Sequence, residues 1–311
     1  MKDIYIKIGI SEENIEKINE ITVELLKNDE NKKDFEEAEK IVFNIDEEIA
    51  KSDDYELKMN HERKNHQMLM DVFGRIIERS GINKYTIYLV VLIYLLGELK
   101  DKYKEKGFSE ELFYETMKDI GYKVKECEDV YGVLGVEPVL WFYSFYTCER
   151  FCLGRLQYEK GIFKEENYKN ELKYGDTVLK CHIPSSGPLK VEDVIESLKE
   201  AYNFYKTDLK DGKLYVTCGS WLLYSKYKEI FPEGSNMRKF YDMFEIISDT
   251  EKPNNPDFWR VFNMNYEEGI LEKVPRDNTL RRNLYEFMKK GNSMGEGYGV
   301  IVFDGDKIVN R

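Results

Sequence analysis

The chain has 311 residues, of which 42% are apolar and 14% aromatic, and its formal net charge is −12. This composition excludes a disordered chain, because there is ample apolar material for packed cores, and the length favours two domains. The acidic balance argues against a nucleic-acid partner or an acidic membrane surface, since binding to phosphates needs a basic face. We therefore expect a globular protein of two domains.

Cysteine usage and the first residues bear on the compartment. The first five residues, MKDIY, lack the charged and then apolar pattern of a secretion signal. Five cysteines, an odd number, stand in aromatic and aliphatic surroundings, so we expect buried thiols in a reducing cytoplasm. Cys148 and Cys152 are one helical turn apart, but with three histidines in the chain we expect no metal site.

The first part of the chain carries helical signals. From Ser11 to Gly121 apolar residues recur every three or four positions, which is typical of amphipathic helices. We predict a helix beginning at Ser11 and further helices over 35–50, 66–79, 84–104 and 109–120, with 51–65 as a loop or an exposed helical turn. The most apolar run, 85–96, is shorter than the roughly 20 residues needed to cross a bilayer and is predicted to be a buried helix.

The pattern changes near residue 150. Pro138 opens an apolar segment that we predict to be a helix as far as Arg150, linking the domains. After it the apolar residues alternate with period two, first in 152–159 and then in 177–183, which indicates strands. We therefore divide the chain into an all-helical domain, 1–150, and a second domain, 151–311.

The second domain alternates between element types. The predicted helices are 191–205, 222–230, 237–241 and 279–290, and the predicted strands are 214–218, 244–248, 258–263 and 298–303. Such alternation is typical of a mixed α/β domain. The predicted fold class is therefore α+β, with a helical domain followed by a mixed sheet domain.

One loop in the second domain suggests an anion site. The strand ending at His182 runs into Ser185, Ser186 and Gly187, and a helix follows. Small residues before a helix N-terminus present backbone N–H groups and the positive end of the helix dipole, which suit a pyrophosphate. The same residues are also ordinary turn formers, and on local grounds the plain turn is favoured.

Five segments in order resemble a known family. They are LGRLQYE at 153–159, HIPSSGPL at 182–189, SWLL at 220–223, SNM at 235–237 with Phe240 and Phe244, and PRDNTL at 275–280. This series resembles the bacterial acyltransferases that join an N-acyltransferase N-terminal helical domain to a GNAT-like C-terminal domain. The resemblance implies a splayed mixed sheet that binds acyl-CoA, with the pyrophosphate on the loop 185–187. The usual glycine-rich GNAT fingerprint is absent from the sequence.

The resemblance and the local chemistry together give candidate site residues. For catalysis they are His182 or Glu159 as the base and Tyr224 as the acid that protonates the leaving thiolate. The candidates for binding acyl-CoA are Ile183, Ser185, Ser186, Gly187 and Ser220, and those for binding the acceptor are Trp221, Asn236 and Arg276. Structural alternatives remain open: an imidazole that ties strands together, a helix cap at Ser220 and a core aromatic ring at Trp221.

Two functions fit these observations. One is an enzyme that moves an acyl group, with acetyl-CoA the favoured donor, directly to the amine of a small molecule or peptide or to another small nucleophile. The other is a catalytically inactive module of the same fold that senses CoA thioesters or docks a protein partner, a possibility raised by the missing fingerprint.

Overall fold

The computed structural model describes residues 2–44, 48–49, 52 and 54–310. The chain divides into two compact units, Met1–Cys152 and Leu153–Arg311, and the boundary predicted from sequence falls between residues 150 and 151. The first unit is helical and the second contains a mixed sheet, so the predicted α+β class is confirmed.

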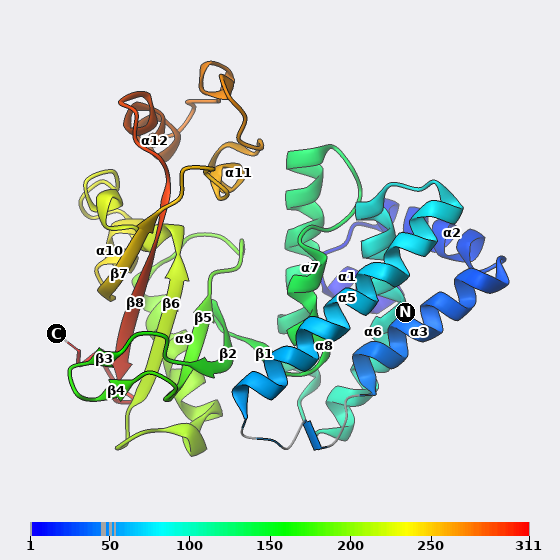
Figure 1. Ribbon diagram of the computed structural model, residues 1–311, viewed down its shortest axis with the longest axis horizontal. Coiled ribbons are helices and arrows are strands. Elements are labelled where there is room, and N and C mark those ends of the chain that lie inside the picture. The colour runs from blue at the N-terminus through cyan, green and yellow to red at the C-terminus, as the bar shows by residue number, and fades with distance from the viewer. Residues whose placement is uncertain (1, 45–47, 50–51, 53, 311) are drawn as a thin grey trace. The chain divides into compact units, whose positions relative to one another are not determined.

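The first unit consists of helices up to residue 146 (Figure 1). They are α1 (Lys2–Lys7), α2 (Glu12–Leu25), α3 (Asp29–Phe43), α5 (Tyr55–Ser80), α6 (Lys84–Glu105), α7 (Glu110–Tyr131), the 3₁₀ turn η1 (Val139–Phe142) and α8 (Tyr143–Tyr146). Side-chain oxygens cap several N-termini, as Ser11 does by accepting a hydrogen bond from the backbone N–H of Asn14. Gly81 and Gly132 end α5 and α7 in left-handed conformations, as glycine C-caps do.

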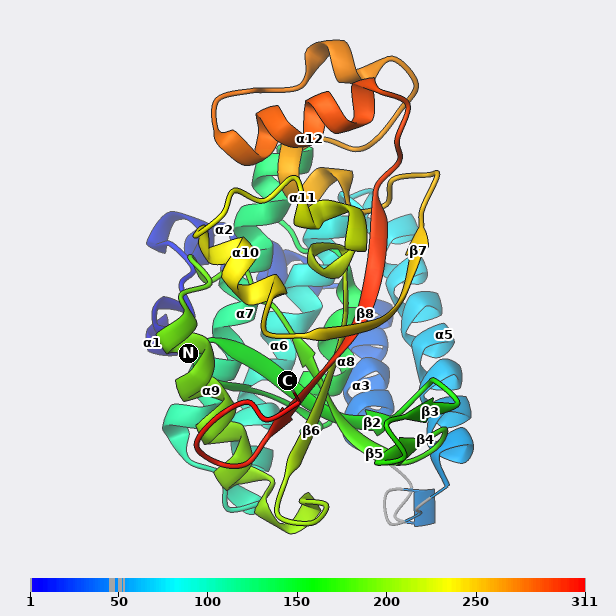
Figure 2. The same cartoon turned by 90° about the vertical axis from the view of Figure 1, so that its left-hand side faces the viewer.

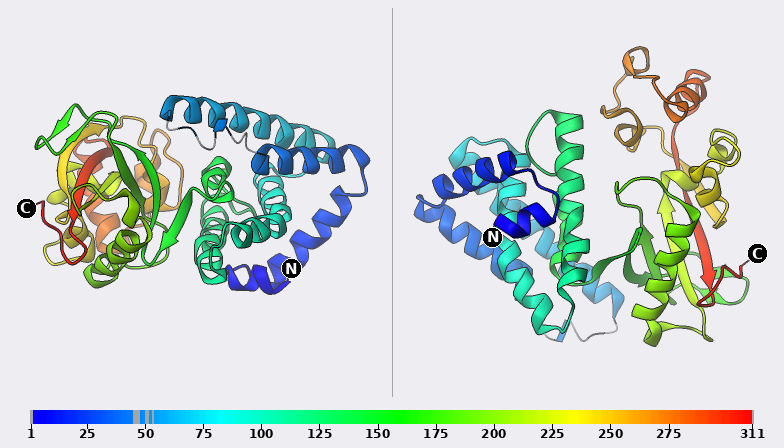
Figure 3. Two further views of the ribbon diagram at one scale, coloured as in Figure 1. Left: turned by 90° about the horizontal axis from the view of Figure 1, so that it is seen from below. Right: turned by 180° about the vertical axis from the view of Figure 1, so that it is seen from behind.

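Helix α6 is the centre of this unit. It lies among the other helices of the unit (Figure 3) and contacts α2, α3, α5 and α7. Most of its residues from Thr86 to Leu99 are buried, which explains why it is apolar nearly all round. None of the described helices is by itself long and apolar enough to cross a membrane. The consecutive pair α5 and α6, bent by 118°, passes such a test together on length and composition only.

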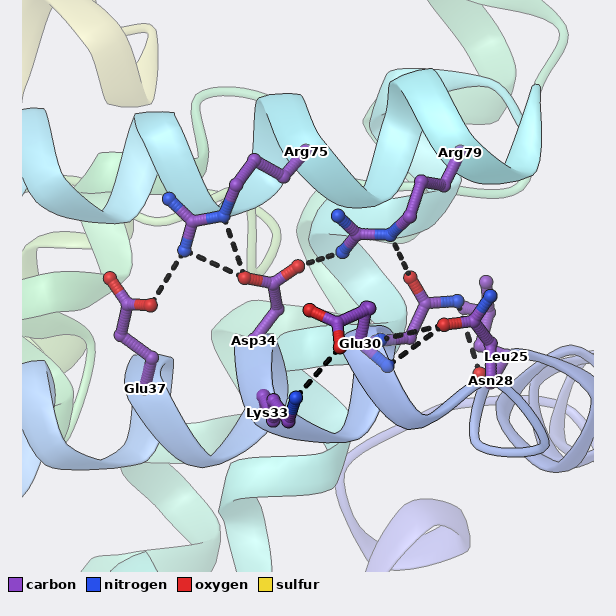
Figure 4. Close-up of polar contacts among 9 residues, drawn as sticks. Leu25, Asn28, Glu30, Lys33, Asp34, Glu37, Arg75 and Arg79 are labelled. Atoms are coloured by element: carbon purple, nitrogen blue, oxygen red, sulfur yellow. Dashed lines mark hydrogen bonds and ion pairs between the residues drawn. The ribbon is translucent and has the colours of Figure 1, made fainter.

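Buried charges join α3 to α5 (Figure 4). The Asp34 side chain is 6% exposed and accepts hydrogen bonds from Arg75, at 2.7 Å, and from Arg79. Arg75 also reaches Glu37 at 2.7 Å, and Arg79 reaches the side-chain oxygen of Asn31 at 2.9 Å. The carboxylate is thus held by two guanidinium groups, which is the arrangement that a buried charge requires.

Three predictions in this half need correction. The segment 51–65, predicted to be a loop or an exposed helical turn, belongs to the long helix α5 from Tyr55 onward, because the Asp54 side chain caps Leu57; residues 51 and 53 lie outside the described residues. The predicted helix 35–50 begins at Asp29 and ends at Phe43, and its predicted positions 45–47 and 50 lie outside the described residues. The predicted helix 138–150 is only η1 and α8, and Cys148, with φ of 59°, has left the helical conformation.

The second unit is built on a mixed sheet. Strand β1 (Arg150–Leu153) spans the boundary between the units, and the others are β2 (Leu156–Ile162), β5 (Thr177–His182), β6 (Leu214–Ser220), β7 (Glu245–Glu251) and β8 (Gly295–Phe303). Within this unit the strand order is β2-β5-β6-β8-β7, and only β5 and β6 run parallel. A short hairpin is formed by β3 (Asn167–Tyr168) and β4 (Leu172–Lys173).

Short helices connect these strands. They are α9 (Val191–Phe204), η2 (Lys206–Asp208), η3 (Trp221–Leu223), η4 (Ser225–Lys228), α10 (Asn236–Tyr241), α11 (Phe258–Phe262), η5 (Ile270–Lys273) and α12 (Thr279–Lys289). The predicted helix 222–230 is wrong, because the chain makes two 3₁₀ turns there and the first lies against β8. The predicted strand 258–263 is also wrong: Phe258, Val261 and Phe262 are all buried, and this spacing belongs to the helix α11.

The two faces of the sheet have different covers. Helix α9 packs on one face (Figure 2). There the Ser197 hydroxyl lies 3.0 Å from the Tyr158 hydroxyl on β2. On the other face, an apolar cluster that includes Phe163, Tyr168 and Val300 covers part of the sheet. Polar side chains of β2 and β5 lie on the same face outside this cluster, and they form the candidate site.

Candidate active site

The parallel strands β5 and β6 separate after a short ladder. Only Leu179 with Val216 and Lys180 with Thr217 are in register across them. Beyond this point β5 stays paired to β2 as far as His182, and β6 stays paired to β8 as far as Ser220. Within the described chain the facing edges of β5 and β6 are therefore unpaired past Lys180 and Thr217. We call this the strand opening; its backbone N–H and C=O groups can bind an extended ligand.

A histidine and a glutamate meet beside the strand opening. Glu159 on β2 lies opposite Lys180, and His182 is its diagonal neighbour on β5, so alternation places all three on one face of the sheet. His182 Nε2 is 3.2 Å from Glu159 Oε1, and the Lys180 ammonium contacts the same carboxylate oxygen. The two residues that the sequence offered as alternative bases thus form a pair.

Burial makes this pair chemically distinctive. The Glu159 side chain is 7% exposed and the His182 side chain is 22% exposed. A carboxylate this deep keeps its charge only when it is paired, and Lys180 supplies a permanent cation. Glu159 therefore places a carboxylate beside the His182 ring, while the imidazole keeps some contact with solvent. This arrangement suits a side chain that accepts a proton.

The predicted anion loop follows β5 directly. Ser185, Ser186 and Gly187 are exposed, and Gly187 has a φ of 114°, which only glycine adopts easily. Helix α9 begins at Val191 and the side chain of its N-cap, Lys190, makes no capping hydrogen bond. Ser185, Ser186 and Gly187 thus lie in the loop several residues before the helix begins, and they are not part of its first turn.

Ser220 and Trp221 lie where β6 ends. Ser220 is the last residue of the strand and its hydroxyl accepts a hydrogen bond from Leu222 N–H at 3.2 Å, which makes it the cap of η3. The Trp221 ring packs edge-on against Tyr227, with ring centroids 6.1 Å apart. Ile183 directly follows β5, across the opening from Ser220, and is half-buried. The candidates Ile183 and Ser220 therefore flank the strand opening from its two sides.

Two buried cysteines stand near the end of the short ladder. Cys181 on β5 and Cys218 on β6 are 1% and 2% exposed. A hydrogen bond with Cys218, together with complete burial, raises the pKa of the Cys181 thiol well above its ordinary value. A thiol held in this way is a poor nucleophile.

The other three predicted residues lie elsewhere in the unit. Tyr224 lies between η3 and η4, and its hydroxyl donates a hydrogen bond of 3.3 Å to the Glu251 carboxylate. Glu251 is on the edge strand β7, which is two strands away from β6. Asn236 is the first residue of α10. Arg276 precedes α12 and stacks its guanidinium 4.5 Å from the centre of the Tyr285 ring. The structure brings His182 and Glu159 together but does not bring these three to them.

Two residues beside the site were not singled out from sequence. Lys180 neutralises Glu159, and Arg155 contacts the anion loop. Strict alternation in 177–183 could have placed Lys180 beside His182 on one face. Nothing local to Arg155 predicts its contacts, because they reach about thirty residues along the chain. Among the described residues no cluster of three His, Cys, Asp or Glu side chains could hold a metal ion.

Family models match both halves of the chain. The model of the N-acyltransferase N-terminal domain matches residues 1–148, and the model of the GNAT-like C-terminal domain matches residues 151–301. No curated protein matches the sequence significantly.

Solved acyltransferase structures share the fold. One, in complex with decanoyl-CoA, is 23% identical with a TM-score of 0.60, and the alignment covers 71% of this chain and 66% of that chain, just under two thirds. Another, in complex with decanoyl-CoA and teicoplanin, is 17% identical with a TM-score of 0.61 over 97% of this chain and 99% of that one. A third, in complex with CoA and 10C-teicoplanin, is 19% identical with a TM-score of 0.60 over 96% and 98%.

The two domain models match in the expected order and together take in residues 1–148 and 151–301. The chain therefore belongs to the two-domain acyltransferase family in which an N-acyltransferase N-terminal domain precedes a GNAT-like C-terminal domain.

Proposed function

We propose that this acyltransferase moves an acyl group from acyl-CoA directly to the amine of a small molecule. The observation that carries the proposal is the strand opening between β5 and β6, with the Glu159–His182 pair beside it and an exposed small-residue loop after β5. Complexes of fold relatives with decanoyl-CoA, CoA and teicoplanin support a CoA thioester as the donor and a small molecule as the acceptor.

Each part of the site has a role in this proposal. The loop from Ile183 to Gly187 binds the phosphates of the donor, and the unpaired edge of β6 near Ser220 donates N–H groups to the thioester arm and to the oxyanion. His182, with the Glu159 carboxylate beside it, takes the proton as the acceptor amine attacks the thioester carbonyl. The tetrahedral intermediate then collapses as its C–S bond breaks, the amide remains, and the protonated His182 gives its proton to the departing sulfur, so that CoA leaves as the thiol.

The identity of the acyl chain and the acceptor is a further proposal. Acetyl-CoA was the donor favoured from sequence alone, whereas the relatives' complexes contain a ten-carbon acyl chain. We therefore propose that the donor range includes medium-chain thioesters. A cytoplasmic location is also proposed, and the five free cysteines support it.

The test is a turnover assay with the full chain. Acetyl-, octanoyl- and decanoyl-CoA are each incubated with a panel of small amines, including aminosugars and amino acids, while release of the CoA thiol and the mass of the acylated product are followed. We expect product and free CoA in equal amounts, with a higher kcat/KM for the medium-chain donors. Binding of the donors without any product across the panel would contradict an amine acyltransferase, and a higher kcat/KM for acetyl-CoA would contradict the chain-length proposal.

A further inference from the structure

The turn that joins β1 to β2 is locked onto helix α9. Gly154 has a φ of 65°, and a Cβ there would lie 3.2 Å from the Cα of Ser197, so a glycine suits both the conformation and the space. The Ser197 hydroxyl accepts a hydrogen bond from Leu156 N–H at 3.1 Å and donates one to the carbonyl of Leu153. The backbone on both sides of Arg155 is therefore fixed to α9.

From this turn Arg155 reaches the loop after β5. Its Nη1 donates to the carbonyl of Pro184 at 3.1 Å, its Nη2 to the carbonyl of Gly187 at 2.6 Å, and its Nε to the carbonyl of Pro188 at 3.1 Å. A planar guanidinium with donors in a fixed fork can hold several carbonyls at once, which a lysine ammonium on a flexible stem does less well. Arg155 thus ties together both ends of the predicted phosphate loop.

These contacts determine which way the loop amides point. In a trans peptide unit the C=O and the N–H point in opposite directions, and the only cis peptide among the described residues precedes Pro138. Because the carbonyls of Pro184 and Pro188 point at Arg155, the N–H groups of Ser185 and Leu189 point away from it. The third carbonyl held by Arg155 is that of Gly187. Its peptide unit ends at the nitrogen of Pro188, which carries no hydrogen.

We propose that Arg155 is a positioning residue for the phosphates of the donor: it holds the carbonyls of the loop and so presents the amides of Ser185 and Leu189 to the anion. This inference rests on the proposed function. The first turn of α9 carries Glu192 and Asp193, which oppose an anion at the helix end itself, so the shaped loop carries the binding.

The experiment measures the affinity for CoA, by calorimetry, of the full chain and of three variants. They are Arg155→Gln, Arg155→Lys and the control Arg281→Gln. Arg281 also ties a carbonyl, that of Val261 at 2.7 Å, but it lies on α12. We expect R155Q to raise the Kd of CoA about tenfold or more, equivalent to about 1.4 kcal/mol, while R281Q leaves it unchanged.

The lysine variant separates shape from charge. If Arg155 positions the loop, R155K keeps the charge but binds CoA as weakly as R155Q; binding like the wild type would overturn the positioning role. A second readout uses decanoyl-N-acetylcysteamine, a donor without phosphates: the R155 variants should raise KM for decanoyl-CoA and leave kinetics with the short donor unchanged. An equal loss with both donors, or with R281Q, would overturn the inference.

Two failures are distinguishable. Equal CoA affinity of wild type and R155Q would overturn the role of Arg155 and leave the proposed function standing. No CoA binding by the wild type would overturn the proposed function, and this inference with it.

Discussion

Replacing His182 by glutamine separates catalysis from folding at the candidate site. Glutamine keeps hydrogen-bonding capacity but cannot act as a general base at neutral pH. General base catalysis contributes about 10²- to 10⁴-fold in rate, which corresponds to roughly 2.7–5.4 kcal/mol. We therefore expect H182Q to lose at least a hundredfold in kcat with the best amine acceptor.

The expected effect of the same change on stability is much smaller. The pair that is lost spans 3.2 Å and its imidazole is 22% exposed, while Glu159 keeps its contact with Lys180. An ion pair of a partly exposed imidazole contributes at most about 1 kcal/mol, so H182Q should melt only a few degrees below the wild type. The cost in rate should thus exceed the cost in stability severalfold.

A matched control lies in the helical unit. The His66 side chain is 23% exposed and stands 3.5 Å from Glu62, so it is a second histidine–glutamate pair whose imidazole is buried to a similar extent, although Glu62 is more exposed than Glu159. His66→Gln should leave both turnover and CoA affinity unchanged. The assay is steady-state turnover with decanoyl-CoA, alongside thermal unfolding and CoA calorimetry of each variant. Turnover of H182Q within about threefold of the wild type, or early unfolding with lost CoA binding, would refute the catalytic assignment.

Three further predictions concern stability. Asp34→Ala leaves two partly exposed arginines without their shared partner and should lower the free energy of unfolding in urea by about 2–3 kcal/mol. Glu37→Gln, at the exposed end of the cluster, should lower it by less than about 1 kcal/mol. Equal costs would contradict the cluster as drawn in Figure 4. Burial raises the pKa of Cys127 and of Tyr143 to about 12. The unfolded chain therefore releases these protons at lower pH than the folded chain, and the free energy of unfolding should fall as pH rises above about 9. A free energy of unfolding that stays constant from about pH 9 to 11 would contradict their burial. Gly297→Ala would put a Cβ 1.9 Å from the carbonyl oxygen of Leu223 in η3 and should destabilise the sheet unit by about 1–3 kcal/mol in the same urea assay. An unchanged midpoint of urea unfolding would argue against this close approach.

The helical half shows what sequence periodicity predicts and what it misses. The stripe of apolar residues in 84–104 reappears as the buried helix α6, because tertiary burial and local pattern agree there. The polar stretch 51–65 has no such stripe, and the sequence left it open between a loop and a helical turn. Its continuity with α5 from Tyr55 was not predicted, because the signal is a single capping residue, Asp54.

The sheet half shows the same limit in another form. Alternation identifies β5 and β6, and the resemblance predicts that the sheet splays. The path of the chain from Trp221 to Ile230 depends on a close contact between η3 and β8. This contact requires a glycine at position 297, about seventy residues downstream. The contacts of Tyr224 with Glu251 and of Arg155 with the loop are likewise long-range, and a local pattern does not contain them.

The most direct measurement is a crystal structure of the full chain with decanoyl-CoA. The account predicts that the pantetheine arm lies between β5 and β6, with the pyrophosphate oxygens within hydrogen-bond distance of the N–H groups of Ser185 and Leu189. It also predicts that the His182 ring faces the thioester. A donor bound away from the strand opening, or phosphates that contact neither amide of the loop, would contradict the account.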